Sequence, residues 1–397
     1  MKSLARDKGK WPVKIIGIEE HFVTADIRAA WAASPIGQEG TAGFDRGEIE
    51  ERLDDLGEQR LALMDESGVD VQVLSVTTPA LHNLEPEESV TLARRTNDLV
   101  VATIAKYPTR FQGFATLPTA APQEAATELE RAVTRLGLVG SMLCGRTREK
   151  NLDHPDFLPM FETAARLGVP LFVHPQIPQR AVREVYYSGF GDQIDTAFAT
   201  FALGWHYEAG IQFVRLILAG VFDKYPDLQI ILGHWGEVVL FYLERLKSLA
   251  RVAHLQRPVA DYIRQNLYVT PSGMWSQSYL QRTLELVGPK RILFSTDYPY
   301  QYRPGGPGRS FIEEAALSPE QMELFAHGNW ERLIGSIRQP DTPQRQGENH
   351  AHSRSMTTSR HHGTNLGRTL RQDPLQEGIS LSSGCTVGRL DSVCRSK

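Results

Sequence analysis

The segment QIILGHWGE, residues 229–237, decides the fold. Its apolar run, Gln229 to Leu232, is too continuous for a strand with one solvent-exposed face. Such a run is typical of a strand in a parallel sheet that is covered on both faces. A polar stretch that contains His234 and Glu237 follows at once. Similar short apolar runs recur at Val13 to Ile18, Val71 to Val76, Phe111 to Thr116, Leu138 to Leu143, Pro170 to Val173, Leu267 to Thr270 and Arg291 to Phe294.

Segments with helical periodicity separate these runs. They are Leu53 to Ser67, Ser89 to Lys106, Ala121 to Thr134, Pro155 to Leu167, Glu208 to Lys224, Glu237 to Ala253, Ser276 to Val287 and Pro319 to Phe325. Eight strand and helix units in about 320 residues predict an α/β protein, a (β/α)8 or TIM barrel. A doubly wound open sheet is the alternative, but it would need fewer strands and usually has a Gly-rich loop after the first one. The first strand here ends in Gly17-Ile18-Glu19-Glu20-His21 instead.

Two long insertions interrupt this alternation. Ser34 to Asp45 is rich in glycine, and Gln176 to Trp205 carries several aromatic residues. In a barrel both would be loops from a strand to the following helix, on the face that carries active sites. Aromatic side chains there would be able to cover a flat, apolar ligand.

The last sixty residues differ in composition from the rest. Residues 338–397 contain no Phe, Trp or Tyr, and they hold nine basic against five acidic side chains. Such a segment can bury little apolar surface against the entropy of ordering it. The sequence therefore predicts a barrel domain over residues 1–337 and a disordered tail over 338–397.

Composition excludes several classes of protein. The formal net charge is −4, so no global basic field points to nucleic acid. No run approaches eighteen apolar residues, and the basic, polar start from Met1 to Lys14 does not resemble a secretory signal. Three cysteines, Cys144, Cys385 and Cys394, cannot form a disulfide framework. We expect a cytoplasmic protein that binds neither membrane nor nucleic acid.

Polar side chains follow four of the predicted strands. Glu19 and His21 end the first strand, where a spacing of two places them on one face, and His174 ends the fifth. The other two groups are His234 with Glu237 after the sixth strand, and Asp297 after the eighth. Taken singly, each acid could cap the following helix and each histidine could be an ordinary loop residue. Together they would meet at one rim of a barrel.

This set suits a metal centre. Two imidazoles and two carboxylates can hold one divalent cation and leave positions open for substrate or water. Such mixed ligands fit Zn²⁺ or Mn²⁺ and do not choose between them. His234 would remain free as a base or an electrostatic group. Glu237 could orient its imidazole, besides favouring the start of the next helix.

In the order of these motifs the chain resembles the amidohydrolase superfamily, and more narrowly its branch of metal-dependent, non-oxidative decarboxylases. The segments that carry the resemblance lie between about Ile15 and Ile334. They are Glu19-Glu20-His21-Phe22, Tyr107-Pro108-x-Arg110-Phe111, Gly220-Val221-Phe222-Asp223-x-Tyr225-Pro226, Gly233-His234-x-Gly236-Glu237, Ser272-Gly273-Met274, Ser295-Thr296-Asp297-Tyr298-Pro299 and Gly328-Asn329-x-x-Arg332-Leu333.

The resemblance implies a role for each candidate residue. The metal ligands would be Glu19, His21, His174 and Asp297. His234 would lie beside the substrate with Glu237 behind it. Arg245 would reach the substrate of a neighbouring subunit in a homodimer or homotetramer, and Tyr300 would contact the substrate. The fourth strand ends Met142-Leu143-Cys144-Gly145 without the lysine that bridges two metals in many superfamily hydrolases, which favours one ion.

The implied substrate is an ortho-hydroxy aromatic carboxylic acid, such as a dihydroxybenzoate or a salicylate. Asp297 would protonate the ring carbon that carries the carboxyl group, and CO₂ would leave. The reverse carboxylation would share the same transition state. A mononuclear metal-dependent hydrolase of a lactone or amide, with His234 as base, is the alternative. A catalytically silent binding protein is a third interpretation.

The loop Thr77-Thr78-Pro79-Ala80-Leu81-His82 departs from the sequence usual in this decarboxylase branch. The loop would face the substrate, so His82 is expected to influence specificity.

Overall fold

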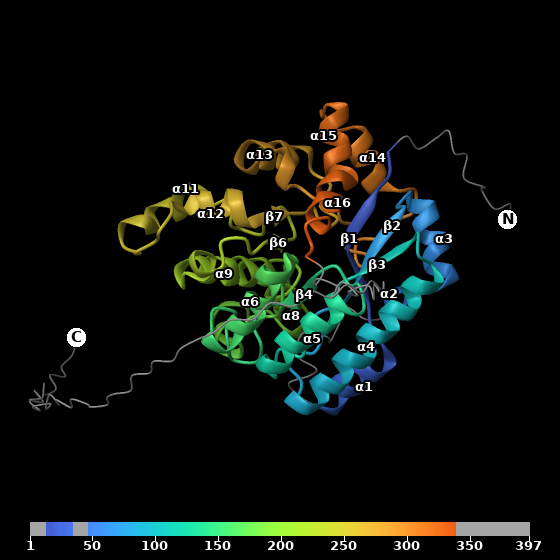
Figure 1. Ribbon diagram of the computed structural model, residues 1–397, viewed down its shortest axis with the longest axis horizontal. Helices are drawn as coiled ribbons and strands as arrows, with labels where there is room; N and C mark the ends of the chain where they lie inside the picture. Colours follow the sequence, from blue (N-terminus) through green and yellow to red (C-terminus); the bar gives the residue numbers. More distant parts are fainter. Residues whose placement is uncertain (1–12, 35–46, 339–397) are drawn as a thin grey trace, which may run out of the picture. The chain divides into compact units, whose positions relative to one another are not determined.

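The computed structural model describes residues 13–34 and 47–338 (Figure 1). Within these ranges the strands are short, buried and parallel to their neighbours. They are β1 (Ile16–Phe22), β2 (Val71–Val76), β3 (Phe111–Gly113), β4 (Ser141–Cys144), β5 (Leu171–His174), β6 (Ile230–Leu232) and β7 (Leu267–Val269).

The strands form two sheets with the orders β1-β2-β3 and β4-β5-β6-β7. A parallel bridge between Ala115 and Ser141 joins the end of β3 to β4. On the other side, the segment 292–298 lies between β7 and β1, because Leu293 N donates to Val269 O (2.9 Å) and Ile18 N donates to Phe294 O (3.1 Å). The predicted eighth strand is thus present as an extended segment that closes the barrel through single bridges. The (β/α)8 barrel is confirmed.

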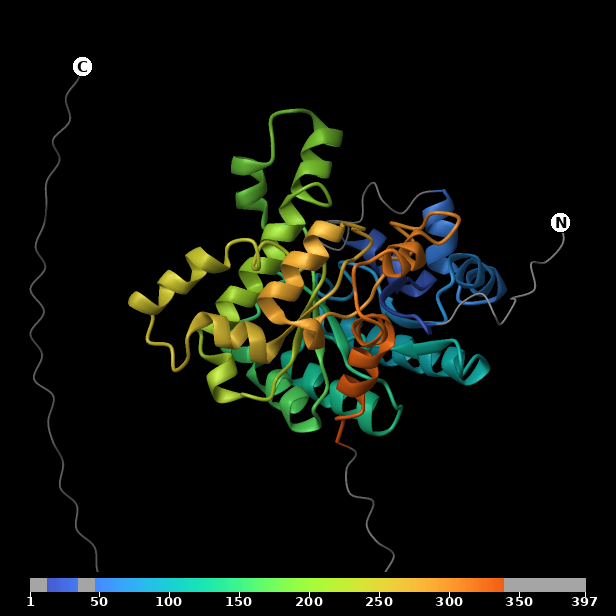
Figure 2. The ribbon, with the colours of Figure 1, turned by 90° about the horizontal axis from the view of Figure 1, so that it is seen from above.

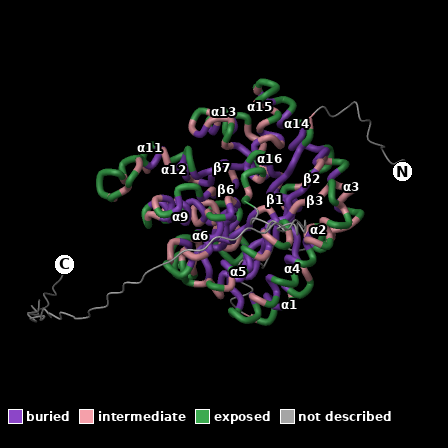
Figure 3. The backbone as a smooth tube through the Cα atoms, in the orientation of Figure 1, coloured by how far each residue is buried: buried purple, intermediate pink, exposed green. Residues whose placement is uncertain are grey.

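Helices surround this barrel, and Figure 3 shows the buried strands at its centre with exposed surfaces outside. The first half of the chain contributes α1 (Ala25–Ala33), α2 (Glu48–Asp54), α3 (Glu58–Ser67), α4 (Pro86–Lys106), α5 (Pro122–Thr134), η1 (Pro155–Phe157), α6 (Leu158–Leu167), α7 (Arg180–Tyr186) and α8 (Asp192–Ala199). The second half contributes α9 (Gly204–Leu218), α10 (Val221–Lys224), α11 (Leu243–Leu246), η2 (Lys247–Arg251), α12 (Val259–Asn266), α13 (Gln277–Val287), η3 (Pro289–Arg291), α14 (Pro307–Glu313), α15 (Pro319–Glu323), η4 (Leu324–Gly328) and α16 (Asn329–Ile334). In the part of the chain that is described, none of these helices combines the length and the apolarity that crossing a bilayer requires.

Local sequence explains where several helices begin and end. Pro86 and Pro122 stand in the first turns of α4 and α5, where a missing N–H costs nothing. The α4 helix therefore starts before Ser89, the predicted first residue. Gly68 and Gly168 end α3 and α6 with φ of 72° and 69°, a conformation that favours glycine.

The prediction of one helix from Glu237 to Ala253 is wrong. The chain there turns repeatedly and forms only α11 and η2, each five residues or shorter. The apolar residues that suggested a helical face do not share one environment, because Val239 and Leu240 are buried whereas Phe241 is 82% exposed. Figure 2 shows this segment (yellow) standing out from the barrel.

The long insertion after β5 is partly helical, which the sequence did not predict. It contains α7 and α8, which project from the barrel in Figure 2 (green). The α7 helix buries no residue, so it lacks the buried apolar stripe by which helices are usually recognised in a sequence. The other insertion, Ser34 to Asp45, lies outside the described residues apart from Ser34, and the tail from 338 lies outside them apart from Arg338.

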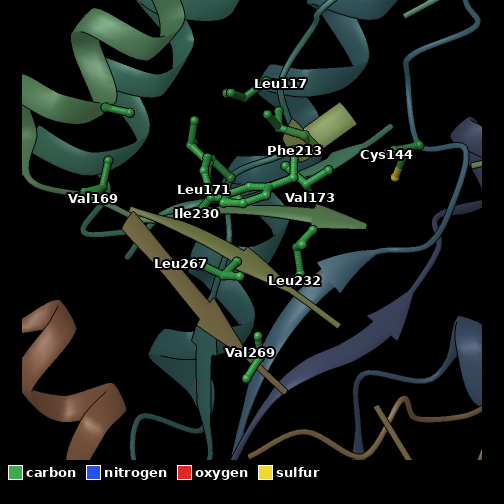
Figure 4. Packing of buried hydrophobic residues seen from close by; sticks show 14 of the residues in the cluster. Leu117, Cys144, Val169, Leu171, Val173, Phe213, Ile230, Leu232, Leu267 and Val269 are labelled. Atoms are coloured by element: carbon green, nitrogen blue, oxygen red, sulfur yellow. The ribbon is translucent and has the colours of Figure 1, made fainter. Parts of the chain in front are cut away.

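Two apolar clusters form the core. Alternate strand residues such as Phe172, Ile231 and Leu293 fill the interior of the barrel, where Trp330 also packs. Residues of opposite parity, such as Leu171 and Val173, pack outward beneath the helices, as Figure 4 shows. This alternation has a period of two, so the residue two beyond Phe172, which is His174, faces the interior at the carboxyl end of β5.

A register shift in β1 directs Glu19 towards the interior of the barrel. Ile18 belongs to the interior cluster, and the pairing of β1 with β2 is irregular between Gly17 and Glu20. A bulge of this kind allows the next residue, Glu19, also to face the interior. Glu20 then turns outward, where it accepts hydrogen bonds from Gln72 and Thr296.

Candidate metal centre and active site

Four side chains meet at the carboxyl ends of the barrel strands. Glu19 and His21 come from β1, His174 comes from β5, and Asp297 follows the eighth segment. Their candidate ligand atoms all lie within 4.8 Å of one another. Nε2 of His21 is 3.5 Å from Oδ1 of Asp297, and Nε2 of His174 is 3.6 Å from Oε1 of Glu19. The structure therefore brings together the four residues that the sequence proposed as ligands.

Two candidate ligand atoms of this group lack a hydrogen-bond partner. Oε1 of Glu19 and Nε2 of His21 are buried and make no hydrogen bond within the described residues. Leaving such polar atoms buried and unpaired costs about 1–3 kcal/mol each. A cation among the four side chains would satisfy them, so this set fits one metal ion.

The other ring nitrogen of each of the two histidines has a partner. Nδ1 of His174 donates to the carbonyl of Pro175 at 2.8 Å, which leaves the lone pair on Nε2. Nδ1 of His21 lies 3.2 Å from Oγ of Ser75. Such contacts fix the tautomer and the orientation of a ligating imidazole.

Three hydroxyl groups surround Oε2 of Glu19. Ser272 Oγ makes the shortest contact, and Ser295 Oγ and Thr270 Oγ1 lie at 3.1 and 3.4 Å. Since these donors occupy Oε2, only Oε1 remains for a cation. Ser272 also accepts a hydrogen bond from the backbone N of His234 at 2.9 Å, so one serine links two parts of the site.

Burial sets the charge of these groups in the protein alone. Burial, with Arg60 second, lowers the pKa of His21 to about 3, and burial likewise lowers the pKa of His174. Both imidazoles are therefore neutral, the form that binds metals. Burial raises the pKa of Glu19 to about 8 and that of Asp297 to about 7. A cation would counter this effect because it favours the ionised carboxylates.

His234 lies beside the four ligand candidates and is paired with Glu237. Nδ1 of His234 is 2.9 Å from Oε1 of Glu237, whose side chain is fully buried. Burial alone would lower the pKa of His234, but the Glu237 carboxylate prevails and raises it to about 10. Nδ1 thus donates to the carboxylate, and Nε2 is left for a ligand.

Backbone strain concentrates at this rim. In the described part of the chain, five of the seven non-glycine residues with positive φ lie here: Ser272 (45°), His234 (47°), Glu237 (54°), Asp297 (58°) and Trp235 (59°). Each such residue costs about 1–3 kcal/mol and tends to occur where function requires a fixed side-chain direction.

A cavity of about 960 Å³ opens above these residues. His174, His234, Asp297 and Ser272 line its polar part. Its apolar part includes Phe201 and Trp205 from the insertion after β5, together with Phe241, Tyr242, Met274 and Tyr279. Its volume would accommodate a small aromatic acid with room to spare.

The structure places three other residues that the sequence singled out in different positions relative to the cavity. Tyr300 lines the cavity, and its hydroxyl lies 2.7 Å from Oγ1 of Thr77. Arg245 is exposed on α11 and does not line the cavity of its own chain, so its contact with a neighbouring subunit stays a prediction. His82 does not face the cavity. It is 1% exposed, and its Nε2 accepts a hydrogen bond from the backbone N of Cys144.

Sequence reasoning missed His206, which lines the cavity and contacts Glu237. A single histidine at the start of a helix gives no local signal of this contact, since 31 residues separate it from Glu237. The hydroxyls of Thr270 and Ser272 were also missed. They follow β7, so the rule that found His174 would have found them if applied to that strand.

Known proteins share this sequence and fold. The family model described as amidohydrolase matches residues 21–335. A γ-resorcylate decarboxylase of Polaromonas sp. is 35% identical over 338 residues, which cover 80% of this chain and 98% of the relative.

Solved structures agree with this result. The 5-carboxyvanillate decarboxylase of Sphingomonas paucimobilis superposes with a TM-score of 0.74 at 31% identity, covering 82% of this chain and all of that one. A dihydroxybenzoic acid decarboxylase of Polaromonas sp., solved with manganese and the inhibitor 2-nitroresorcinol, superposes with a TM-score of 0.72 at 31% identity, covering 81% and 97%. The chain is thus a member of the amidohydrolase family.

Proposed function

We propose that the protein is a metal-dependent, non-oxidative decarboxylase, a carboxy-lyase that removes CO₂ from an ortho-hydroxy aromatic carboxylic acid. One observation carries the proposal: a buried group of two imidazoles and two carboxylates, with unpaired inward atoms, opens on a large, partly aromatic cavity. The relatives and solved neighbours that are named as decarboxylases of hydroxylated benzoates support it.

Glu19, His21, His174 and Asp297 would hold one divalent ion, Mn²⁺ or Zn²⁺. When bound, this ion supplies a fixed positive charge that attracts the carboxylate and the neighbouring hydroxyl oxygen of the substrate. Manganese in a solved neighbour makes Mn²⁺ the first ion to test.

Asp297 is the proposed proton donor to the ring. Asp297 is the acidic side chain that both belongs to the ligand group and lines the cavity, so it can reach the ring of a bound acid. Burial raises its pKa to about 7 in the protein alone. Transfer of that proton to the ring carbon that bears the carboxylate forms a C–H bond and interrupts the aromatic system. Cleavage of the C–C bond then returns its electron pair to the ring, and CO₂ leaves. The reverse sequence of steps would carboxylate the phenol.

His234 and Glu237 are proposed to stabilise negative charge on the substrate. Nε2 of His234 is available to a ring oxygen because Nδ1 is held by Glu237. A positioned donor of this kind is worth a few kcal/mol in the transition state. The apolar wall that includes Phe201 and Trp205 would exclude water, and Tyr300 is proposed to contact the substrate from the side of Thr77.

A panel of acids tests the proposed function. The Mn²⁺-loaded protein is expected to release CO₂ from 2,6-dihydroxybenzoate or a related ortho-hydroxy acid, and not from 3,5-dihydroxybenzoate, which lacks an ortho hydroxyl. Lactones and amides belong in the same assay, because the alternative function is a mononuclear hydrolase. Hydrolysis of those compounds without any CO₂ release would reject the decarboxylase.

We also propose that the protein works in the cytoplasm as a homodimer or homotetramer in which Arg245 reaches the substrate of a neighbouring subunit. Arg245 lies on α11, close in sequence to two exposed aromatic residues. Phe241 is 82% exposed and Tyr242 is 42% exposed. Complementation tests this arrangement. Arg245→Ala and Asp297→Asn are each expected to be inactive, and a mixture that exchanges subunits should regain activity. A stable, active monomer would contradict it.

A further inference from the structure

His206 is the third residue of α9, and both nitrogens of its imidazole have partners. Nδ1 lies 2.8 Å from Oε2 of Glu237. Nε2 lies 3.1 Å from the backbone carbonyl oxygen of Phe201, which belongs to the insertion after β5. The side chain lines the same cavity as His234, and the two rings meet edge to face with centroids 4.6 Å apart.

Both partners of His206 are acceptors. A carbonyl oxygen can only accept, and so can the ionised carboxylate of Glu237. Glu237 already accepts from His234 through Oε1. Although burial opposes ionisation, His234 and the hydrogen bonds from both imidazoles hold the pKa of Glu237 below its usual value. Nδ1 of His206, 2.8 Å from Oε2, therefore donates to the carboxylate.

These two hydrogen bonds fix the orientation of the Glu237 carboxylate. Its side chain is fully buried, and each oxygen receives one N–H, from His234 at 2.9 Å and from His206 at 2.8 Å. Without His206, Oε2 would be buried and unpaired. The carboxyl group could then take up a proton or rotate, and Nδ1 of His234 would no longer be fixed as a donor.

We propose that His206 is a positioning residue that keeps Glu237 an acceptor for His234 and thereby fixes which nitrogen of His234 faces the substrate. The inference rests on the decarboxylase function proposed above. His206 also links the aromatic wall of the cavity to His234. One continuous chain of hydrogen bonds runs from the Phe201 carbonyl through His206 and Glu237 to His234.

A second interpretation of the same residues is a separate metal site. His206, His234 and Glu237 offer three ligand atoms within 4.8 Å of one another. The contacts argue against it, because Nε2 of His206 is already engaged by a carbonyl, and both Nδ1 atoms lie at ordinary hydrogen-bond distances from the carboxylate. The two interpretations predict different metal contents.

Three substitutions separate the two hydrogen bonds of His206. The amide of asparagine can replace Nδ1, that of glutamine can replace Nε2, and leucine replaces neither. We expect His206→Leu and His206→Gln to lower kcat by about 10- to 100-fold, as loss of an orienting partner typically does, with KM changed less than about threefold. His206→Asn should stay within about fivefold of the wild-type kcat. Rescue by glutamine and not by asparagine would overturn the proposal.

The pair His327 and Glu331 provides a matched control. Nδ1 of His327 is also 2.8 Å from a glutamate oxygen, and its side chain is 16% exposed, against 21% for His206. His327→Asn and His327→Leu are expected to leave kcat unchanged. Metal analysis should find one equivalent in the wild type and in every His206 variant. Two equivalents in the wild type and one in the variants would overturn the proposal in favour of a metal ligand.

Nuclear magnetic resonance of protein labelled with ¹⁵N-histidine tests the same inference without any turnover. The signals that disappear in His206→Leu identify His206, and its Nδ1 should carry a hydrogen. A hydrogen on Nε2 alone would contradict the proposal. If the wild type releases no CO₂ from any acid in the panel, the proposed function fails, and this spectrum still decides the state of His206.

Discussion

Nε2 of His174 lies 3.6 Å from Oε1 of Glu19, although β5 and β1 lie in different sheets of the barrel. The two atoms face each other because the second polar atom of each side chain is held by another hydrogen bond. Nδ1 of His174 donates to Pro175, and Oε2 of Glu19 is surrounded by hydroxyls. This distance, too long for a hydrogen bond and short enough to be bridged by an ion, is the basis of the first predictions.

Replacing Asp297 by asparagine should nearly abolish turnover. The amide cannot donate a carboxylic proton to the ring, and loss of a general acid costs about 100- to 10,000-fold in rate. Some metal should remain bound, because Glu19, His21 and His174 are unchanged. CO₂ release and elemental analysis of the same preparation check both statements. A fully active Asp297→Asn enzyme would remove Asp297 from this role.

Replacing Ser272 by alanine should weaken metal binding about 10- to 100-fold, because Oε2 of Glu19 loses its closest donor and the carboxylate can turn. Competition with a chelator measures the affinity directly. Ser67→Ala is a suitable control, since Ser67 is half-buried and its hydroxyl donates to backbone carbonyls within α3, away from Glu19. Equal metal affinity in Ser272→Ala and the wild type would count against this role.

Stability should depend on pH through buried His82. Burial lowers the pKa of His82 from 6.5 to about 4, so the unfolded chain binds this proton more readily than the folded one. The contribution is present above pH 6.5 and is lost as the pH falls towards 4. At pH 5 about 2 kcal/mol of this contribution has been lost.

Denaturant unfolding of the metal-free protein measures this dependence. His82→Gln retains an acceptor for the N–H of Cys144 but cannot be protonated. Its stability should fall less steeply than that of the wild type between pH 6.5 and 5. Parallel curves for the two proteins would show that His82 is not the group responsible.

The barrel domain is proposed to end near residue 337. Arg338 is the last residue with a described contact, a hydrogen bond from its backbone N to the carbonyl of Leu167 at 2.8 Å. A chain that ends at residue 342 should therefore keep the melting temperature and kcat/KM of the full-length protein. A large drop in either value would assign the remaining residues a structural or catalytic part.

Much of the site followed from the sequence because parallel strands place their carboxyl ends on one rim. His174 follows Leu171-Phe172-Val173 directly, so its location required only the strand assignment. The same reasoning found Glu19, His21 and Asp297. The bulge that turns both Ile18 and Glu19 inward was not visible in the sequence, since a one-residue register shift leaves no compositional trace.

The rest depended on tertiary contacts. His206 contacts Glu237 across 31 residues of chain, and the helix that carries His206 was predicted to start only at Glu208. The segment after Glu237 was predicted as a helix, yet the positive φ of His234, Trp235 and Glu237 directs the chain into turns. Strain of this kind is maintained by the surrounding structure and runs against local preference, so local sequence could not reveal it.

The most direct test of the account is the mass of the ring product formed from an ortho-hydroxy aromatic acid in D₂O, with oxygen excluded. We predict that the Mn²⁺-loaded enzyme replaces the carboxyl group by one deuterium on the ring carbon and releases one CO₂. An acid that is consumed only when oxygen is supplied, or an acid that survives while a lactone is hydrolysed, would contradict non-oxidative decarboxylation.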